Sequence, residues 1–345
     1  MTIPELTLRG TPAERGETHG EAMRDSIAGA FEAWKESVAP SMNPDEFIGR
    51  LVNDTGFLSA AKTHTPDLVE EVQGIAVGSN QPFEAMFAWQ LVDEGWWYLA
   101  ELTGELKPLE KCSALTINHD GHGLVAQTQD LDRHYDHAHV MLRTFDPEGL
   151  EILTPSIAGL LALNGVNSAG LAVGITTLSP LAHSPNGLSS GFVLPRLLRC
   201  RSVEEALDVL RRTPLASGNS FILGQRDRSV IVEVSSDAVD IDTDGNRAVH
   251  TNHPLTQNPV WDYARFASST ERFDQLDKTV RTDSTLAELV EMYGSGAICQ
   301  SRSIDGPIVS VGTMLFELGD TQRCHYAPGP LDSDELVTYE MTGSD

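Results

Sequence analysis

The spacing of apolar residues divides the chain into a first third with helical periodicity and a strand-rich remainder. Within residues 19–38, apolar side chains from Met23 to Trp34 recur at three- and four-residue intervals, which predicts an amphipathic helix. Thr65 followed by Pro66 is typical of the first positions of another helix. The first third of the chain is therefore expected to be mostly helical.

An aromatic segment closes this helical part. Residues 82–100 read PFEAMFAWQLVDEGWWYLA, which favours a largely buried helix. Its tryptophans, Trp89, Trp96 and Trp97, are expected in the hydrophobic core rather than around a ligand.

From Cys112 onward the pattern changes to the alternation of β-strands. Residues 113–129 alternate around a glycine-containing turn, as a hairpin does. Further strand-like runs occupy residues 139–145, 150–159, 167–178, 218–241 and 313–329. Helical runs lie between them at 191–213, 265–280 and 285–296, and Ser202 with Glu205 predicts a capping box. Helices followed by strand pairs with interspersed helices predict an α+β protein with largely antiparallel sheets.

Length, composition and charge indicate which kinds of binding partner and location the protein can have. The 345 residues, 40% hydrophobic and 21% charged, suit a globular protein of one large domain or two moderate ones. Fifty acidic against 24 basic residues give a formal charge of −26, which disfavours nucleic acid and anionic membrane surfaces. No apolar run has the length of a membrane span, and the first residues lack the pattern of a secretory signal. Four widely spaced cysteines suggest no disulfide framework, so a cytoplasmic location is expected.

The hairpin carries the first candidate chemistry. Cys112 lies nine residues before Gly121 and Asp130 nine residues after it. A turn centred on Gly121 would place the two residues opposite each other, about 5 Å apart on neighbouring strands. A thiol beside a carboxylate is a candidate catalytic pair, although a buried structural cysteine is the simpler interpretation from these residues alone.

The bond between Lys111 and Cys112 offers a base for that thiol. Cleavage there would give Cys112 its own α-amino group, whose ordinary pKa of about 7.7–8.0 suits a general base. An N-terminal nucleophile of this kind needs no separate histidine. Because the thiol can attack the carbonyl that precedes it, such cleavage can be autocatalytic. No cofactor or metal is required.

Several motifs in a fixed order carry a family resemblance. They are Glu71, Gly74, Ile75, Ala76 and Gly78 in the pattern E-x-x-G-I-A-x-G; the cleavage-site hairpin of residues 111–132; Asn167, Gly170 and Leu171; and residues 201–237 followed by VHTNHPL. In order and spacing the chain resembles the acyl-coenzyme A:6-aminopenicillanic acid acyltransferase (isopenicillin N acyltransferase) family of N-terminal nucleophile hydrolases.

The resemblance implies a four-layer αββα N-terminal nucleophile hydrolase fold with two packed, mostly antiparallel sheets. Residues 1–111 would form a helical propeptide segment that is retained after cleavage, and residues 112–345 the catalytic portion. Cys112 would be the nucleophile and, through its α-amine, the base. Asp130 would orient that amine, and Asn219 would stabilise the oxyanion.

Three positions depart from the family pattern. Thr176 stands where many relatives have an asparagine, Ser310 falls near a family arginine, and Lys111 is larger than the residue often found before the nucleophile. Three functions therefore stay open. The first is hydrolysis of a small N-acyl or peptide-like amide through a Cys112 thioester. The second is acyl transfer from a thioester donor to an amine, and the third is an unprocessed, non-catalytic binding protein. The oligomeric state is left open.

Other polar clusters carry weaker predictions. Residues 132–139 contain three histidines and two aspartates, but their spacing fits no common zinc pattern, so a solvated loop is expected. His250 and His253 suit either a pocket wall or a structural turn. Residues 174–191 lack the G-x-S-x-G motif of a serine hydrolase.

Overall fold

The computed structural model describes residues 3–105, 112–260, 267–303, 306–331 and 336–342. The part before Cys112 begins with a strand, β1 (Glu5–Leu8), and continues as helices. These are α1 (Pro12–Ala22), α2 (Arg24–Val38), α3 (Pro44–Asn53), α4 (Phe57–His64), α5 (Pro66–Ser79), α6 (Phe83–Gln90) and α7 (Val92–Thr103). In the described ranges, no helix is both long and apolar enough to cross a membrane.

The strands form two sheets. The eight-stranded sheet has the order β1, β4 (His139–Phe145), β5 (Glu151–Ile157), β6 (Gly165–Asn167), β7 (Ala172–Thr177), β8 (Asn219–Gln225), β9 (Arg228–Val234) and β10 (Val239–Gly245). The six-stranded sheet has the order β11 (Arg247–His250), β2 (Ser113–His119), β3 (His122–Asp132), β12 (Ile308–Leu318), β13 (Arg323–Ala327) and β14 (Val337–Glu340). Strands β1 and β4 are parallel, and the other pairings between these strands are antiparallel.

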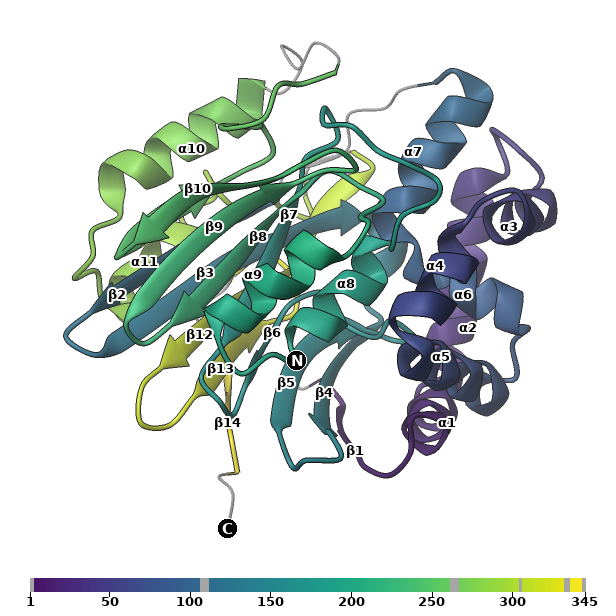
Figure 1. Cartoon of the computed structure of the whole chain (residues 1–345), viewed down its shortest axis with the longest axis horizontal. Coiled ribbons are helices and arrows are strands. Elements are labelled where there is room, and N and C mark those ends of the chain that lie inside the picture. The colour runs from purple at the N-terminus through teal and green to yellow at the C-terminus, as the bar shows by residue number, and fades with distance from the viewer. Residues whose placement is uncertain (1–2, 106–111, 261–266, 304–305, 332–335, 343–345) are drawn as a thin grey trace.

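The two sheets pack face to face between helical layers. Met141 and Ile222 of the larger sheet share a buried cluster with Val125 and Phe316 of the smaller one. Helices α10 (Ala267–Thr279) and α11 (Leu286–Gly294) cover the outer face of the six-stranded sheet, where Leu276 and Tyr293 pack with Leu115 and Ala126. Helices α8 (Ser190–Leu197) and α9 (Val203–Arg212) and the helices before Cys112 cover the other sheet (Figure 1). The predicted four-layer αββα fold is confirmed.

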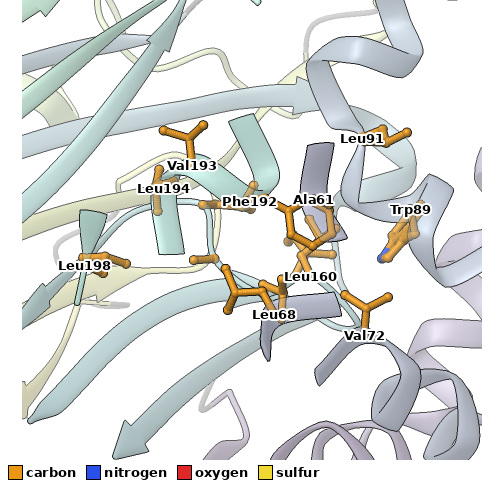
Figure 2. Packing of buried hydrophobic residues seen from close by; sticks show 14 of the residues in the cluster. Ala61, Leu68, Val72, Trp89, Leu91, Leu160, Phe192, Val193, Leu194 and Leu198 are labelled. Atoms are coloured by element: carbon orange, nitrogen blue, oxygen red, sulfur yellow. The ribbon is translucent and has the colours of Figure 1, made fainter. Parts of the chain in front are cut away.

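One core joins the helices before Cys112 to the sheets after it. Figure 2 shows Leu68 and Val72 of α5 beside Leu160 and Phe192 in this cluster. The indole nitrogen of Trp89 donates a hydrogen bond to the carbonyl oxygen of Ala158 at 3.1 Å. The two parts of the chain are therefore packed as a single body.

Helices α1 and α5 cross at backbone contact because glycines line the crossing. A Cβ atom on Gly16 would lie 1.9 Å from the carbonyl oxygen of Glu71, and one on Gly74 would lie 2.2 Å from that of Ala13. At the same crossing, the guanidinium of Arg15 binds the Glu71 carboxylate at 2.6 Å, with both side chains buried. The E-x-x-G-I-A-x-G pattern therefore encodes a helix crossing.

Two predicted helix starts differ in detail. The Ser202 hydroxyl accepts from the backbone N–H of Glu205, as predicted. The Glu205 carboxylate, however, accepts from the backbone N–H of Arg201 and not from that of Ser202, so the capping box is incomplete. Thr65 precedes α5, yet its hydroxyl donates to the carbonyl of Ala61 in α4. The Thr65 hydroxyl therefore bonds to the end of α4 and does not cap α5.

The β2–β3 hairpin differs from the prediction by one residue. Its turn consists of Asp120 and Gly121, with φ of 49° and 77°, and is not centred on Gly121. The two-residue turn sets a register that, continued to Cys112, points to Gln129 instead of Asp130. The prediction that Cys112 and Asp130 stand directly opposite each other is therefore wrong, because the two-residue turn shifts the register by one residue. Such a shift moves a side chain to the other face of the strand.

We predict that Gly74→Ala destabilises the protein, because the added methyl group overlaps the backbone of α1. The free energy of unfolding should fall by about 1–3 kcal/mol. Gly29→Ala in α2 is the matched control, since nothing lies within 4 Å of its added Cβ. Urea denaturation of both variants measures the difference, and equal midpoints for the two would contradict the crossing.

Candidate active site

Cys112 lies directly before β2, at the wall of a small cavity. Its side chain is 6% exposed, and its Sγ lies 3.9 Å from the carbonyl oxygen of Asp130. The cavity, which we name the narrow recess, has a volume of about 40 Å³. Gln129, Leu131 and Leu163 are among its other lining residues. The thiol thus faces a mainly apolar recess.

The backbone of Cys112 is held by Arg272 of α10. The guanidinium donates to the Cys112 carbonyl oxygen at 2.6 Å, to the Ser113 hydroxyl at 2.7 Å and to the Asn252 side-chain oxygen at 3.0 Å. Burial lowers the pKa of Arg272, whereas the charges of Asp130 and of a Cys112 thiolate act in the opposite direction. Because a guanidinium keeps its proton in proteins, Arg272 is a fixed cation beside the cysteine.

Asp130 is buried near the end of β3. One of its carboxylate oxygens accepts a hydrogen bond of 2.5 Å from the hydroxyl of Ser310 on β12. The register between these strands shifts between Ser310 and Gly312. Ser310, noted in the sequence only as a departure from the family pattern, is thus a direct partner of Asp130.

Asn219 begins β8 and lies opposite Thr177 of β7. Its amide nitrogen donates to one carboxylate oxygen of Asp93 at 2.8 Å, and the Thr177 hydroxyl donates to the other at 3.0 Å. Asp93 and Thr177 line the narrow recess together with Cys112. Since an amide carries two N–H donors, Asn219 has a second one besides that used by Asp93.

A second asparagine, Asn252, also belongs to this site. Its amide donates to the carbonyl oxygen of Thr177 at 3.1 Å, and its oxygen accepts from Arg272. Asn252 lies within VHTNHPL, a motif of the family resemblance, but no role was predicted for it from the sequence. The position inside that motif was the available signal, whereas nothing local marked Arg272.

The two histidines of that motif contact buried polar side chains. His250 is fully buried and its imidazole contacts the Glu233 carboxylate at 3.1 Å and the Thr176 hydroxyl at 3.1 Å. The His253 ring contacts the Ser269 hydroxyl at 2.8 Å. These contacts favour the structural-turn alternative for both residues.

A larger cavity, the wide recess, adjoins the narrow one and has a volume of about 400 Å³. Val92, Asp93, Leu131 and Thr177 line both cavities. Trp96, expected in the core, is half-buried and lines the wide recess. Trp89 and Trp97 are buried as predicted.

Residues 132–139 are not a solvated loop. Tyr135 and His139 are buried, and Asp136 pairs with Arg302 at 2.7 Å. Within the described residues, no group of three or more histidine, cysteine or acidic side chains could hold a metal ion. Lys111 lies outside the described residues.

Comparison with known proteins places this chain in a family. The family model for acyl-coenzyme A:6-aminopenicillanic acid acyl-transferases matches residues 117–296, just over half of the chain. The chain belongs to this family. Because this family is one of acyl-transferases, the prediction that the protein is an enzyme is confirmed.

The chain is also similar to individual proteins, among them one sequence relative and two solved structures. The 40 kDa form of acyl-coenzyme A:6-aminopenicillanic-acid-acyltransferase from Emericella nidulans is 25% identical over 255 residues, covering 72% of this chain and 69% of the relative. Among solved structures, a variant of conjugated bile acid hydrolase from Clostridium perfringens has a TM-score of 0.46 at 13% identity, covering 68% of this chain and 94% of that one. Penicillin V acylase from Agrobacterium tumefaciens has a TM-score of 0.44 at 15% identity, covering 67% and 85% respectively.

Glu94, next to Asp93, is a fully buried carboxyl group behind the recess. It accepts hydrogen bonds from the Ser190 backbone N–H at 2.9 Å and the Ser217 hydroxyl at 2.6 Å. Burial, and then the neighbouring charge of Asp93, raise the pKa of Glu94 to about 7. Burial also raises the pKa of Asp93.

We predict that Glu94 makes stability fall as the pH rises. With a pKa of about 7 in the folded state and 4.5 as its ordinary value, the folded protein holds this proton more tightly. Stability is therefore lost between about pH 4.5 and pH 7, by roughly 3 kcal/mol. Glu94→Gln should lack this loss, so its advantage over the wild type should grow between pH 5 and pH 8 in urea denaturation. Parallel pH profiles for the two proteins would contradict the prediction.

Proposed function

We propose that the protein is a cysteine N-terminal nucleophile enzyme that hydrolyses an amide bond of a small N-acyl or peptide-like substrate through a thioester on Cys112. One observation carries the proposal. Cys112 borders a recess while its carbonyl oxygen is fixed by the buried cation Arg272. A purely structural cysteine needs neither the recess nor the cation.

The same arrangement supports self-cleavage between Lys111 and Cys112. In this proposal, Sγ attacks the Lys111 carbonyl carbon, the amide C–N bond breaks and the Cys112 nitrogen takes up a proton. Water then hydrolyses the resulting thioester and leaves Cys112 with a free α-amino group. Arg272 positions the cysteine backbone, and Asp130, held by Ser310, orients the new amine.

Turnover repeats this chemistry on a substrate. The α-amine accepts the thiol proton, and the thiolate attacks the substrate carbonyl carbon. Asn219, whose amide is oriented by Asp93, donates its second N–H to the tetrahedral oxyanion. The intermediate expels the amine, which takes the proton, and water releases the acid from the thioester.

Residues 1–111 remain bound to residues 112–345 after cleavage in this proposal. Strand β1 pairs with β4 over four residues, from Glu5 with Met141 to Leu8 with Thr144. The helices that follow share the core shown in Figure 2. The two cleavage products would therefore form one compact domain.

Acyl transfer to an amine is a second candidate, favoured by the acyltransferase name of the Emericella nidulans relative. A transferase must hold the amine near the thioester so that it competes with water. Incubation of processed enzyme with an acyl thioester and graded amines distinguishes the two functions. Free acid alone at every amine concentration supports hydrolysis, whereas an amide product that rises with the amine supports transfer.

We predict that purified wild-type protein consists of two chains divided between Lys111 and Cys112. Intact-mass spectrometry should show both fragments, and Cys112→Ala should stay a single chain. Arg272→Met should slow the cleavage, since it removes the donor to the Cys112 carbonyl. Cys200→Ala, between α8 and α9, is the matched control and should be cleaved normally. Wild-type protein that stays uncut would overturn the proposed mechanism.

We predict that Asn219→Ala lowers kcat by roughly 10²–10³-fold with a smaller change in KM, because one oxyanion donor is lost. Steady-state kinetics on the processed enzyme measures both constants. Asn252→Ala is assayed in parallel, since its amide belongs to the same site. A large loss of kcat in Asn252→Ala with none in Asn219→Ala would move the donor role to Asn252.

A further inference from the structure

The wide recess combines an aromatic wall with negative charge. Trp34 of α2 and Trp96 of α7 line it, and so does the carboxylate of Asp93. Its described lining residues include no lysine or arginine. Burial lowers the pKa of His134, another lining residue, to about 4, so that its ring is neutral near pH 7. Aromatic faces and a carboxylate together attract organic cations.

Asp93 differs from Glu71 and Glu233, two buried carboxylates that contact a basic side chain. Glu71 pairs with Arg15, and Glu233 contacts His250. Asp93 accepts only from neutral donors, Asn219 and Thr177 among them. In the described part of the chain, no ion pair involves Asp93.

A carboxylate removed from water is stabilised most by an opposite charge. Glu94 behind it is buried with neutral donors as well, so the neighbourhood favours a cation further. Asp93 is half-buried and open to both recesses, which leaves it accessible to a ligand.

We propose that the substrate carries a protonated amine or quaternary ammonium group, which binds in the wide recess between Asp93 and the tryptophan wall. The scissile carbonyl then lies toward Cys112, because Asp93 also borders the narrow recess that contains the thiol. The wide recess, at about 400 Å³, has the volume of a small-molecule site. This inference rests on the proposed function and names its substrate class.

The first test compares matched substrates on the processed enzyme. Each pair of amides differs only in a trimethylammonium group or its neutral tert-butyl counterpart; one pair carries this group on the acyl side and another on the amine side. For at least one pair, kcat/KM should favour the cation by about tenfold or more. Equal kcat/KM within both pairs would overturn the inference while leaving the proposed function intact.

Variants test which residues cause the preference for the cationic substrate. In Asp93→Asn and Trp96→Leu the preference should fall to about twofold, mainly through the KM of the cationic substrate. Trp96→Leu leaves the contact between Asp93 and Asn219 in place, so it separates cation binding from the proposed oxyanion donor. Asp240→Asn, on an exposed position of β10, is the matched charge control and should keep the full preference.

A binding measurement covers the case in which no test amide is turned over. Tetramethylammonium should quench tryptophan fluorescence of the processed wild type at constant ionic strength, with Kd raised about tenfold in Asp93→Asn. Absence of binding, or equal Kd in the two proteins, would overturn the inference. Absence of both turnover and a Cys112 thioester, with tetramethylammonium still bound, would count against the proposed function alone.

Discussion

The geometry around Cys112 depends on one buried guanidinium. Arg272 stays protonated, so its N–H groups need hydrogen-bond acceptors inside the protein. Oxygen atoms of Cys112, Ser113 and Asn252 accept these hydrogen bonds. Cys112 and Ser113 lie 160 and 159 positions from Arg272 in the chain, and Asn252 lies 20 positions from it. The packing of Leu276 of α10 on the six-stranded sheet thereby sets where the cysteine backbone lies.

Local sequence patterns predicted the elements well because alternation and helical spacing are properties of neighbouring residues. The strands at 139–145 and 219–225 are of this kind. The predicted register of the hairpin was wrong by one residue, because the register depends on the conformation of the turn. In this turn Asp120 takes a positive φ beside Gly121. Alternation fixes the faces of each strand only after that turn is known.

The contacts that complete the site could not be predicted from local sequence patterns. Arg272 and Cys112 are separated by 160 positions, and Asn219 and Asp93 by 126. No spacing rule connects residues at these distances, and a lone arginine in a polar helix carries no local signal. The hairpin spacing already made Cys112 and Asp130 candidates, and the family resemblance gave them roles and added Asn219. The fold adds the partners that surround these three residues.

The buried or half-buried carboxylates Glu71, Asp93 and Glu94 have two kinds of hydrogen-bond partner. Glu71 is neutralised by Arg15 at the crossing of α1 and α5, where the pair fixes two helices and faces no cavity. Asp93 and Glu94 are placed at the start of α7 with neutral donors, where the helix N-terminus offers only partial positive charge. Carboxylates held in this way cost stability unless something external compensates them, and such a cost is tolerated where a ligand binds.

The position of α7 also explains why the segment before Cys112 belongs to the site. Trp97 in this helix donates from its indole nitrogen to Ser217 at 2.9 Å, and Ser217 in turn donates to Glu94. The helix is thereby attached to the loop before β8, whose first residue is Asn219. A cut at Lys111–Cys112 would leave these non-covalent contacts in place. The same helix would then supply both the wall of the recess and the carboxylate that orients Asn219, so loss of the segment would remove the site even though Cys112 lies outside it.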